Sequence, residues 1–142
     1  VATMAETKIK SIPTKSVLES KCVGCLLGSM LGDCLGSAVE GWPAARIVTH
    51  FTYLRTMEAG VHMGTYFLRQ GMYTDDTNAT LALASSIVEN SGLVPGHAAK
   101  QYGLFWKSKP ERGYPGSAKA VMQAVLDGKD WRKTGTVRFP DG

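Results

Sequence analysis

The sequence has few cysteines and no pattern that would pair them. Three occur among 142 residues. An odd number argues against a disulfide framework and favours a reducing compartment inside the cell, such as the cytoplasm, the nucleus or the mitochondrion. Cys22 and Cys25 have the C-x-x-C spacing of a zinc or redox half-site, but no second C-x-x-C accompanies them. We therefore interpret both as small packing residues in the interior.

Strong charge of one sign is also missing. The net charge is +4, and neither end carries a basic tail or an acidic arm, so we expect no direct nucleic-acid partner. The composition, 44% hydrophobic and 20% charged, is typical of a soluble globular domain. No segment alternates convincingly with a period of two, and there is no internal repeat or low-complexity tract. These absences exclude a strand-rich fold and a repeat array, and they favour an all-α fold.

Apolar residues recur instead with helical spacing. The pattern predicts helices over about 20–39, 77–90, 97–107 and 117–127, with residues 1–19 as a flexible leader. The stretch 44–70 is compatible with a helix or a strand. In the later helices we expect the following side chains to face inward: Leu81, Ala84, Ile87, Val88, Ala118, Val121, Met122, Val125 and Leu126.

The first predicted helix combines an apolar face with a glycine at every fourth position, Gly24, Gly28, Gly32 and Gly36. Each interior glycine costs about 1 kcal/mol relative to alanine, so the stripe predicts close approach of another backbone or of a ligand. The run is long enough to raise the question of a membrane span. Asp33 lies inside it, however, and we interpret it as a buried helix of a soluble protein. Glu40 would lie two turns beyond Asp33 on the same face.

The most informative stretch is "YTDDTNATLALA", residues 73–84, in which two adjacent carboxylates lie between two threonines at the start of a helix. Capping of the helix explains one such residue, because Thr and Asp accept hydrogen bonds from free N–H groups. The pair Asp75–Asp76 also gathers hard oxygen donors that suit Mg²⁺, Mn²⁺ or Ca²⁺. From spacing alone, metal binding and elaborate capping are equally compatible with this motif.

Two segments together resemble the ADP-ribosylglycohydrolase family. They are "GCLLGSMLGDCLGSAVE", residues 24–40, and "YTDDTNATLALA" some forty residues later. Within that family, "GDCLGSAVE" and "PERGY" are most similar to the serine-type third vertebrate ADP-ribosylhydrolase. The resemblance extends over residues 20 to about 125. It implies an all-α, orthogonal multi-helix fold and a hydrolase that cleaves ADP-ribose from an acceptor at the anomeric carbon.

The resemblance also implies roles for particular residues. Glu40, Thr74, Asp75 and Asp76 match metal ligands in a cleft that holds two Mg²⁺ ions, with Mn²⁺ as a possible substitute. Glu40 and Asp75 are the catalytic candidates, and Asp33 is a structural carboxylate beside the metals. Asp75 would also contact the substrate, together with a loop that contains Gly113, Tyr114 and Gly116. The implied partners are proteins or polymers that carry ADP-ribose. We expect a monomer without a membrane partner.

The sequence also departs from the family pattern. Pro115 stands where the family has a glycine, and proline offers no N–H to a phosphate. The second aspartate cluster, of the D-x-D-T type, and an "N-G-G-A-M-R"-like segment are absent from the sequence. We therefore expect 20–142 to be the N-terminal part of a longer domain that holds half of the metal site. The alternative function is that of a non-catalytic relative, such as a crystallin-like structural protein.

Overall fold

The computed structural model describes residues 14–57 and 70–135, and every regular element in these ranges is helical. The all-α prediction is therefore confirmed. The elements in chain order are α1 (Lys15–Gly36), the 3₁₀ turn η1 (Ser37–Val39), α2 (Ala44–Phe51), α3 (Asp75–Asn90), α4 (Pro95–Ser108), α5 (Gly116–Leu126) and α6 (Trp131–Thr134). Much of the ambiguous stretch 44–70 lies outside the described residues, but its first part is the helix α2.

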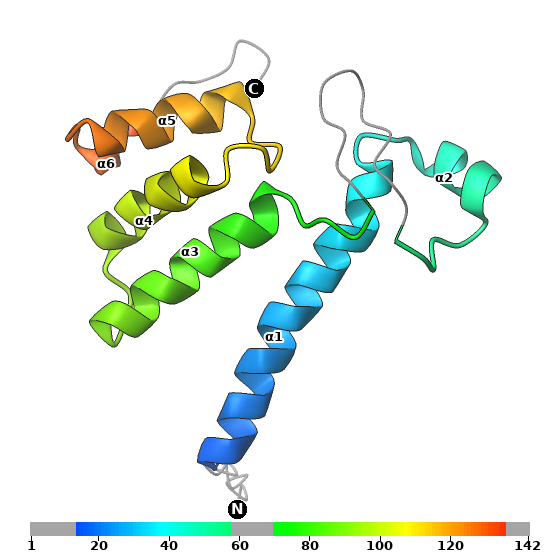
Figure 1. Cartoon of the computed structure of the whole chain (residues 1–142), viewed down its shortest axis with the longest axis horizontal. Helices are drawn as coiled ribbons and strands as arrows, with labels where there is room; N and C mark the ends of the chain where they lie inside the picture. The colour runs from blue at the N-terminus through cyan, green and yellow to red at the C-terminus, as the bar shows by residue number, and fades with distance from the viewer. Residues whose placement is uncertain (1–13, 58–69, 136–142) are drawn as a thin grey trace, which may run out of the picture.

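Helices α3, α4 and α5 form the packed part of the molecule, and they lie side by side in chain order (Figure 1). Helix α4 is in the middle and contacts both neighbours, while α6 folds back against α5. Gly103 allows α4 and α5 to approach closely, because a Cβ at this position would lie 2.7 Å from the Cγ atom of Leu126. This three-helix layer holds the start of α3 in place, where the two aspartates lie.

The buried face of α3 differs from the predicted one. Ile87 and Val88, which we expected to face inward, are exposed. Besides Thr77, which bonds to α1, the buried positions are Asn78, Ala82 and Ser86, which recur every four residues on the side of α4. Two of them are polar, so an apolar pattern cannot reveal them. Their side chains instead make hydrogen bonds to other elements, which removes the cost of burying them.

Helix α1 also departs from its prediction. It begins at Lys15, so residues 15–19 are helical rather than part of a leader, and it ends at Gly36 rather than near Val39. Glu40 follows the 3₁₀ turn and is therefore not on the same helical face as Asp33. In α1 only Cys34 is fully buried, whereas Cys22 and Cys25 are exposed, contrary to the prediction that they pack in the interior.

No part of the described structure packs against the glycine stripe. A Cβ added at Gly24, Gly28, Gly32 or Gly36 would find no neighbouring heavy atom within 4 Å, apart from the backbone of its own helix. The large apolar residues Val23, Leu27 and Leu31 are about half exposed. The prediction of a buried helix is therefore wrong for the described residues, where α1 meets the rest of the chain mainly near the start of α3 (Figure 1).

The segment Lys15–Val39 is long and apolar enough to cross a membrane by length and composition. A core helix of a soluble protein and an N-terminal signal sequence pass the same test, so this observation alone is weak. One feature of the segment is specific: Asp33 within it accepts hydrogen bonds from a neighbouring helix. The segment is therefore fastened to the domain at its carboxyl-terminal end.

Candidate active site

A single carboxylate in α1 fastens the start of α3. Asp33 accepts hydrogen bonds from the backbone amides of Thr74 and Thr77, at 2.8 Å and 3.1 Å, and from the hydroxyl groups of the same two threonines. Free N–H groups at a helix N-terminus favour a negative charge, so this position suits a carboxylate. Both threonines of the T-D-D-T motif are therefore used to join α1 to α3.

Helix capping accounts for the threonines of the motif but not for its aspartates. Thr74 is the N-cap, and its hydroxyl oxygen accepts a hydrogen bond from the backbone amide of Asp76 at 3.3 Å. Asp75 and Asp76 occupy the first turn of the helix, beyond the capping residue. The two interpretations that the sequence left open therefore apply to different residues, since the threonines hold the helix and the carboxylates are available for another purpose.

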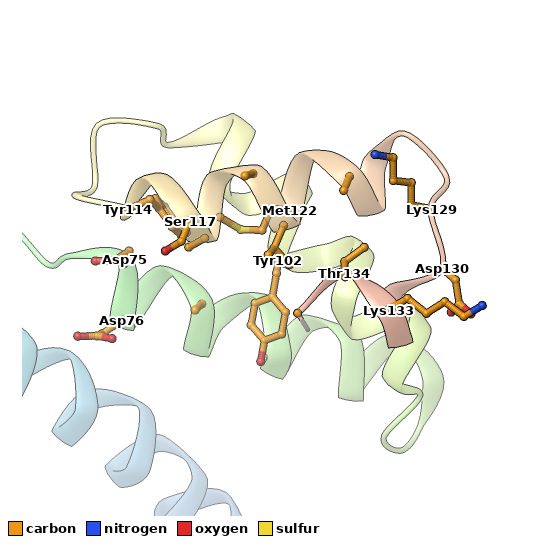
Figure 2. Close-up of a pocket in the computed structure, with 16 residues that line it drawn as sticks. Asp75, Asp76, Tyr102, Tyr114, Ser117, Met122, Lys129, Asp130, Lys133 and Thr134 are labelled. Atoms are coloured by element: carbon orange, nitrogen blue, oxygen red, sulfur yellow. The ribbon is translucent and has the colours of Figure 1, made fainter. Parts of the chain in front are cut away.

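The two aspartates point to different sides of the α3 N-terminus (Figure 2). Asp75 lies on the side of Tyr114 and Ser117, whereas Asp76 lies on the side of α1. Both line a hollow of about 1090 Å³ that is bordered by α3, α4, α5 and α6 and has Lys129 and Lys133 at its far end. Asp76 also lines a second, smaller hollow.

The smaller hollow, of about 290 Å³, lies between α1 and the start of α3. Its lining residues are Gly32, Asp33, Gly36, Ser37, Glu40, Thr74 and Asp76. Gly32 and Gly36, the last two residues of the glycine stripe, leave space here that side chains would fill. Three of the four predicted metal ligands, Glu40, Thr74 and Asp76, border this space together. The fourth, Asp75, belongs to the larger hollow.

The carboxylates at this site destabilise one another's charges. Burial is the main cause that raises the pKa of Asp75, and repulsion from Asp76, Glu40 and Asp33 adds to it, while the backbone amide of Asp75 acts in the opposite direction. Burial also raises the pKa of Asp76, with repulsion from Asp33 and Glu40. A raised pKa means that the ionised pair costs folding free energy, which a proton or a bound cation would offset.

The donor set fits a hard divalent cation in chemistry, because it consists of carboxylate and hydroxyl oxygens. It is not a complete site, however. Among the described residues, no three His, Cys, Asp or Glu side chains lie close enough together to hold a metal ion. The described residues can therefore supply two neighbouring carboxylates, a hydroxyl and a nearby glutamate, and further ligands would have to be water or other groups.

The predicted loop lies where it can contact Asp75. Gly113 has a φ angle of +93°, which favours glycine, and a Cβ at this position would lie 3.7 Å from Oδ1 of Asp75. Tyr114 is buried and lines the larger hollow, whereas Gly116 is exposed at the first turn of α5. The structure thus brings Gly113 and Tyr114 to the aspartates across about forty residues of sequence.

Two residues that hold this loop, Asn78 and Arg112, were not predicted from the sequence. The side-chain amide of Asn78 donates a hydrogen bond to the Tyr114 hydroxyl at 2.6 Å, and Arg112 donates to the carbonyl of Tyr73 at 3.0 Å. Asn78 lies in a stretch that looks like an ordinary amphipathic helix, and Arg112 looks like one of many surface cations. The one available signal was a polar residue three positions before Leu81, which we expected to face inward.

The family of this chain is shown by comparison with known proteins. Residues 14–142 match the model of the ADP-ribosylglycohydrolase family. The chain is 30% identical over 107 residues to ADP-ribosylhydrolase ARH3 of Gallus gallus, an alignment that covers 72% of this chain and 29% of that protein. With the ARH3 of Homo sapiens it shares 28% identity over 111 residues, which cover 78% of this chain and 31% of the relative.

A bacterial relative gives the same result. The ADP-ribosyl-[dinitrogen reductase] glycohydrolase of Rhodospirillum rubrum is 31% identical over 93 residues, which cover 66% of this chain and 31% of the relative. The chain thus spans about a third or less of the length of these curated relatives. The all-helical architecture of the described residues and the T-D-D-T helix start agree with the extent of the family match, and the chain belongs to the ADP-ribosylglycohydrolase family.

Proposed function

We propose that the protein is a hydrolase that releases ADP-ribose from modified proteins or polymers by cleavage at the anomeric carbon. One observation carries this proposal. The hydroxyl groups of both threonines of the T-D-D-T motif donate hydrogen bonds to Asp33, whereas Asp75 and Asp76 line two hollows and do not cap the helix. Relatives whose names describe ADP-ribosyl hydrolases support the reaction class.

We propose Mg²⁺, or Mn²⁺ in its place, as the cofactor. Thr74, Asp75, Asp76 and Glu40 would supply ligands, because their oxygens are those that these ions prefer and because a cation would offset the repulsion among the carboxylates. Water or other groups would complete the coordination. When bound, the ions would supply charge that orients the ribose hydroxyls and polarises the anomeric centre. Direct binding can be measured without any reaction, by following the paramagnetic signal of Mn²⁺ in a titration of wild type and of Asp76→Asn.

The residues of this chain have separable tasks in the proposed reaction. One water adds to the anomeric carbon, the bond from that carbon to the acceptor oxygen breaks, and a proton passes to the departing oxygen. Asp75, half-buried beside Gly113, would bind and orient the ribose. Glu40, exposed at the edge of the smaller hollow, would move the proton and gate the cleft.

Three classes of substrate fit the proposed reaction. Candidates are serine-linked ADP-ribose on protein, poly(ADP-ribose) and O-acetyl-ADP-ribose. Incubation of the native protein and Mg²⁺ with each compound, followed by quantification of free ADP-ribose, ranks them. We expect the serine-linked peptide to be turned over fastest, and an arginine-linked peptide serves as the comparison. A higher rate on the arginine linkage would contradict the proposed specificity.

Two variants test the roles of the carboxylates. Asp75→Asn keeps the shape of the side chain but removes its charge, so Mg²⁺-dependent release should fall by about a hundredfold or more. Glu40→Gln should lower turnover strongly while leaving Mn²⁺ binding by Asp75 and Asp76 detectable. Wild-type activity in Asp75→Asn would refute the site, and an unchanged rate in Glu40→Gln would leave Glu40 as a surface charge.

A further inference from the structure

The loop over Asp75 is fastened to the start of α3 at two points. The residue before Gly113, Arg112, is joined to Tyr73, and the residue after it, Tyr114, is joined to Asn78. On the α3 side these contacts flank Asp75, since Tyr73 precedes it and Asn78 follows it by one helical turn. The peptide of Gly113 is therefore held between two fixed neighbours, directly beside the Asp75 carboxylate.

The first contact, the hydrogen bond between Asn78 and Tyr114, is deeply buried. Asn78 is 2% exposed and Tyr114 is 3% exposed. The amide nitrogen of Asn78 donates to the Tyr114 hydroxyl at 2.6 Å and to the Phe105 carbonyl at 3.0 Å, so both of its hydrogens have acceptors. A buried amide whose two hydrogens are both used has one allowed orientation, because any rotation would leave a polar group unpaired. Asn78 therefore fixes the position of Tyr114 relative to α3 and α4.

The second contact, between Arg112 and Tyr73, combines a hydrogen bond with a cation–π contact. The guanidinium group of Arg112 lies 3.8 Å from the centre of the Tyr73 ring and donates to the Tyr73 carbonyl at 3.0 Å. The Arg112 side chain is 12% exposed, so little solvent competes with these contacts. A planar guanidinium can stack and donate at the same time, which the ammonium group of lysine cannot do in the same geometry.

We propose that Asn78 and Arg112 are positioning residues that hold Gly113 against Asp75 and so fix the orientation of this carboxylate in the site. Neither side chain touches the hollows directly, and each acts through the loop residue to which it is bonded. This inference rests on the proposed function, because it assigns the two residues to the orientation of ADP-ribose by Asp75. Misplacement of a reacting group by about 1 Å can cost about a hundredfold in rate.

Tyr114→Phe is the most selective test, because it removes one buried hydroxyl and keeps the ring. Arg112→Lys is the second variant, since it keeps the charge and removes the planar group. Ser86→Ala is the matched control. It removes another hydrogen bond of a buried α3 side chain, the one between Ser86 and Nδ1 of His97 at 2.8 Å, two turns further along the same helix face. All three should lose stability, but only the first two should disturb the loop.

Two measurements separate positioning from general stability in the native protein. Amide hydrogen exchange in the loop, read at the backbone amide of residue 112, which donates to the Lys109 carbonyl at 3.3 Å, should become faster in Tyr114→Phe and Arg112→Lys, and remain unchanged in Ser86→Ala. In the ADP-ribose release assay, the first two variants should have kcat lowered by about tenfold with KM close to that of wild type. Ser86→Ala should retain both constants.

The outcomes distinguish this inference from the proposed function. Unchanged loop exchange in both test variants would overturn the fastening. Unchanged kcat in both, while Asp75→Asn is inactive, would overturn the positioning role alone. Wild-type activity in Asp75→Asn would refute the proposed function, and the positioning role would be refuted with it, whatever the exchange rates show. Loss of kcat in Ser86→Ala equal to that in Tyr114→Phe would also overturn it.

Discussion

The Asp33 carboxylate in α1 accepts hydrogen bonds from both the backbone amide and the side-chain hydroxyl of Thr77 in α3. The two residues are separated by 44 positions in the sequence. Through this contact and the equivalent one to Thr74, a single side chain satisfies free N–H groups at the start of α3 and places that start beside α1. The position of both aspartates of the motif therefore depends on a residue in another helix.

Asp33→Asn should be strongly destabilising. An asparagine keeps one acceptor oxygen and turns an NH₂ group toward the donors of Thr74 and Thr77, which leaves buried N–H and O–H groups unpaired. We expect a loss of about 2–3 kcal/mol in the free energy of unfolding, measured by urea denaturation. Glu19→Gln is the control on the same helix, because among the described residues Glu19 forms only an exposed ion pair, with Lys15. Its effect should stay within about 0.5 kcal/mol, and equal effects of the two substitutions would contradict the role of Asp33.

Asp75→Asn should have the opposite effect on stability. A negative charge in the first turn of a helix is favourable by up to about 1 kcal/mol. The pKa of Asp75 is nevertheless raised, so burial and repulsion outweigh this term. Removal of the charge should then stabilise the protein at pH 7 by roughly 0.5 kcal/mol, since the group is only partly buried. A variant that is both inactive and more stable would indicate that the carboxylate is retained for function.

The raised pKa of Asp75 also predicts how the stability difference between wild type and Asp75→Asn depends on pH. An acid whose pKa is raised on folding contributes stability that is complete below its unfolded-state pKa, about 3.9 for aspartate, and that is lost as pH rises through the folded-state value. The advantage of Asp75→Asn over wild type should therefore be largest near pH 7 and shrink as pH falls toward 4. Urea denaturation at a series of pH values measures it. An advantage that does not change with pH would have a source other than the carboxylate charge.

Divalent cations should stabilise the wild-type protein by relieving the repulsion between Asp75 and Asp76. A ligand at a hundred times its Kd adds about 2.7 kcal/mol, so millimolar Mn²⁺ or Mg²⁺ should raise Tm measurably. The double variant Asp75→Asn, Asp76→Asn should not respond. NaCl at matched ionic strength is the control, because it screens charges without binding a specific site. An equal rise in Tm with NaCl would contradict a cation site.

Sequence reasoning succeeded where local pattern determines structure. The helical period and the capping residue Thr74 predicted α3 to within two residues of its start, because these signals act within one turn. The motif also drew attention to Asp75 and Asp76 before their surroundings were known. Local signals do not contain the contact between Asp33 and the threonines, which depends on how two distant helices pack.

The failures concern burial and polar contacts. Ile87 and Val88 have the spacing of a core face, but the polar residues Asn78 and Ser86 are buried instead, because each finds a hydrogen-bond partner on another element. Burial of a polar residue depends on that partner, which no periodicity reveals. The role of Arg112 was not predicted for the same reason, because it depends on the contact of this side chain with Tyr73.

Replacing glycine by alanine at Gly28 and at Gly103 should change the free energy of unfolding in opposite directions. Gly28 is inside α1 with open space where a Cβ would be, so Gly28→Ala should stabilise the chain by about 1 kcal/mol through helix propensity. Gly103 is buried against Leu126, where a Cβ would approach Cγ to 2.7 Å, so Gly103→Ala should cost about 1–3 kcal/mol by overpacking. Chemical denaturation of both variants measures the contrast.

A second substitution identifies the cause at Gly103. In a double-mutant cycle with Leu126→Ala, the cost of Gly103→Ala should largely disappear, because the smaller side chain leaves room for the added methyl group. Additive effects would show that the loss does not come from this contact. At Gly28 the informative outcome is destabilisation, which would mean that another backbone or molecule packs against the glycine stripe in solution, as the spacing of its four glycines predicted.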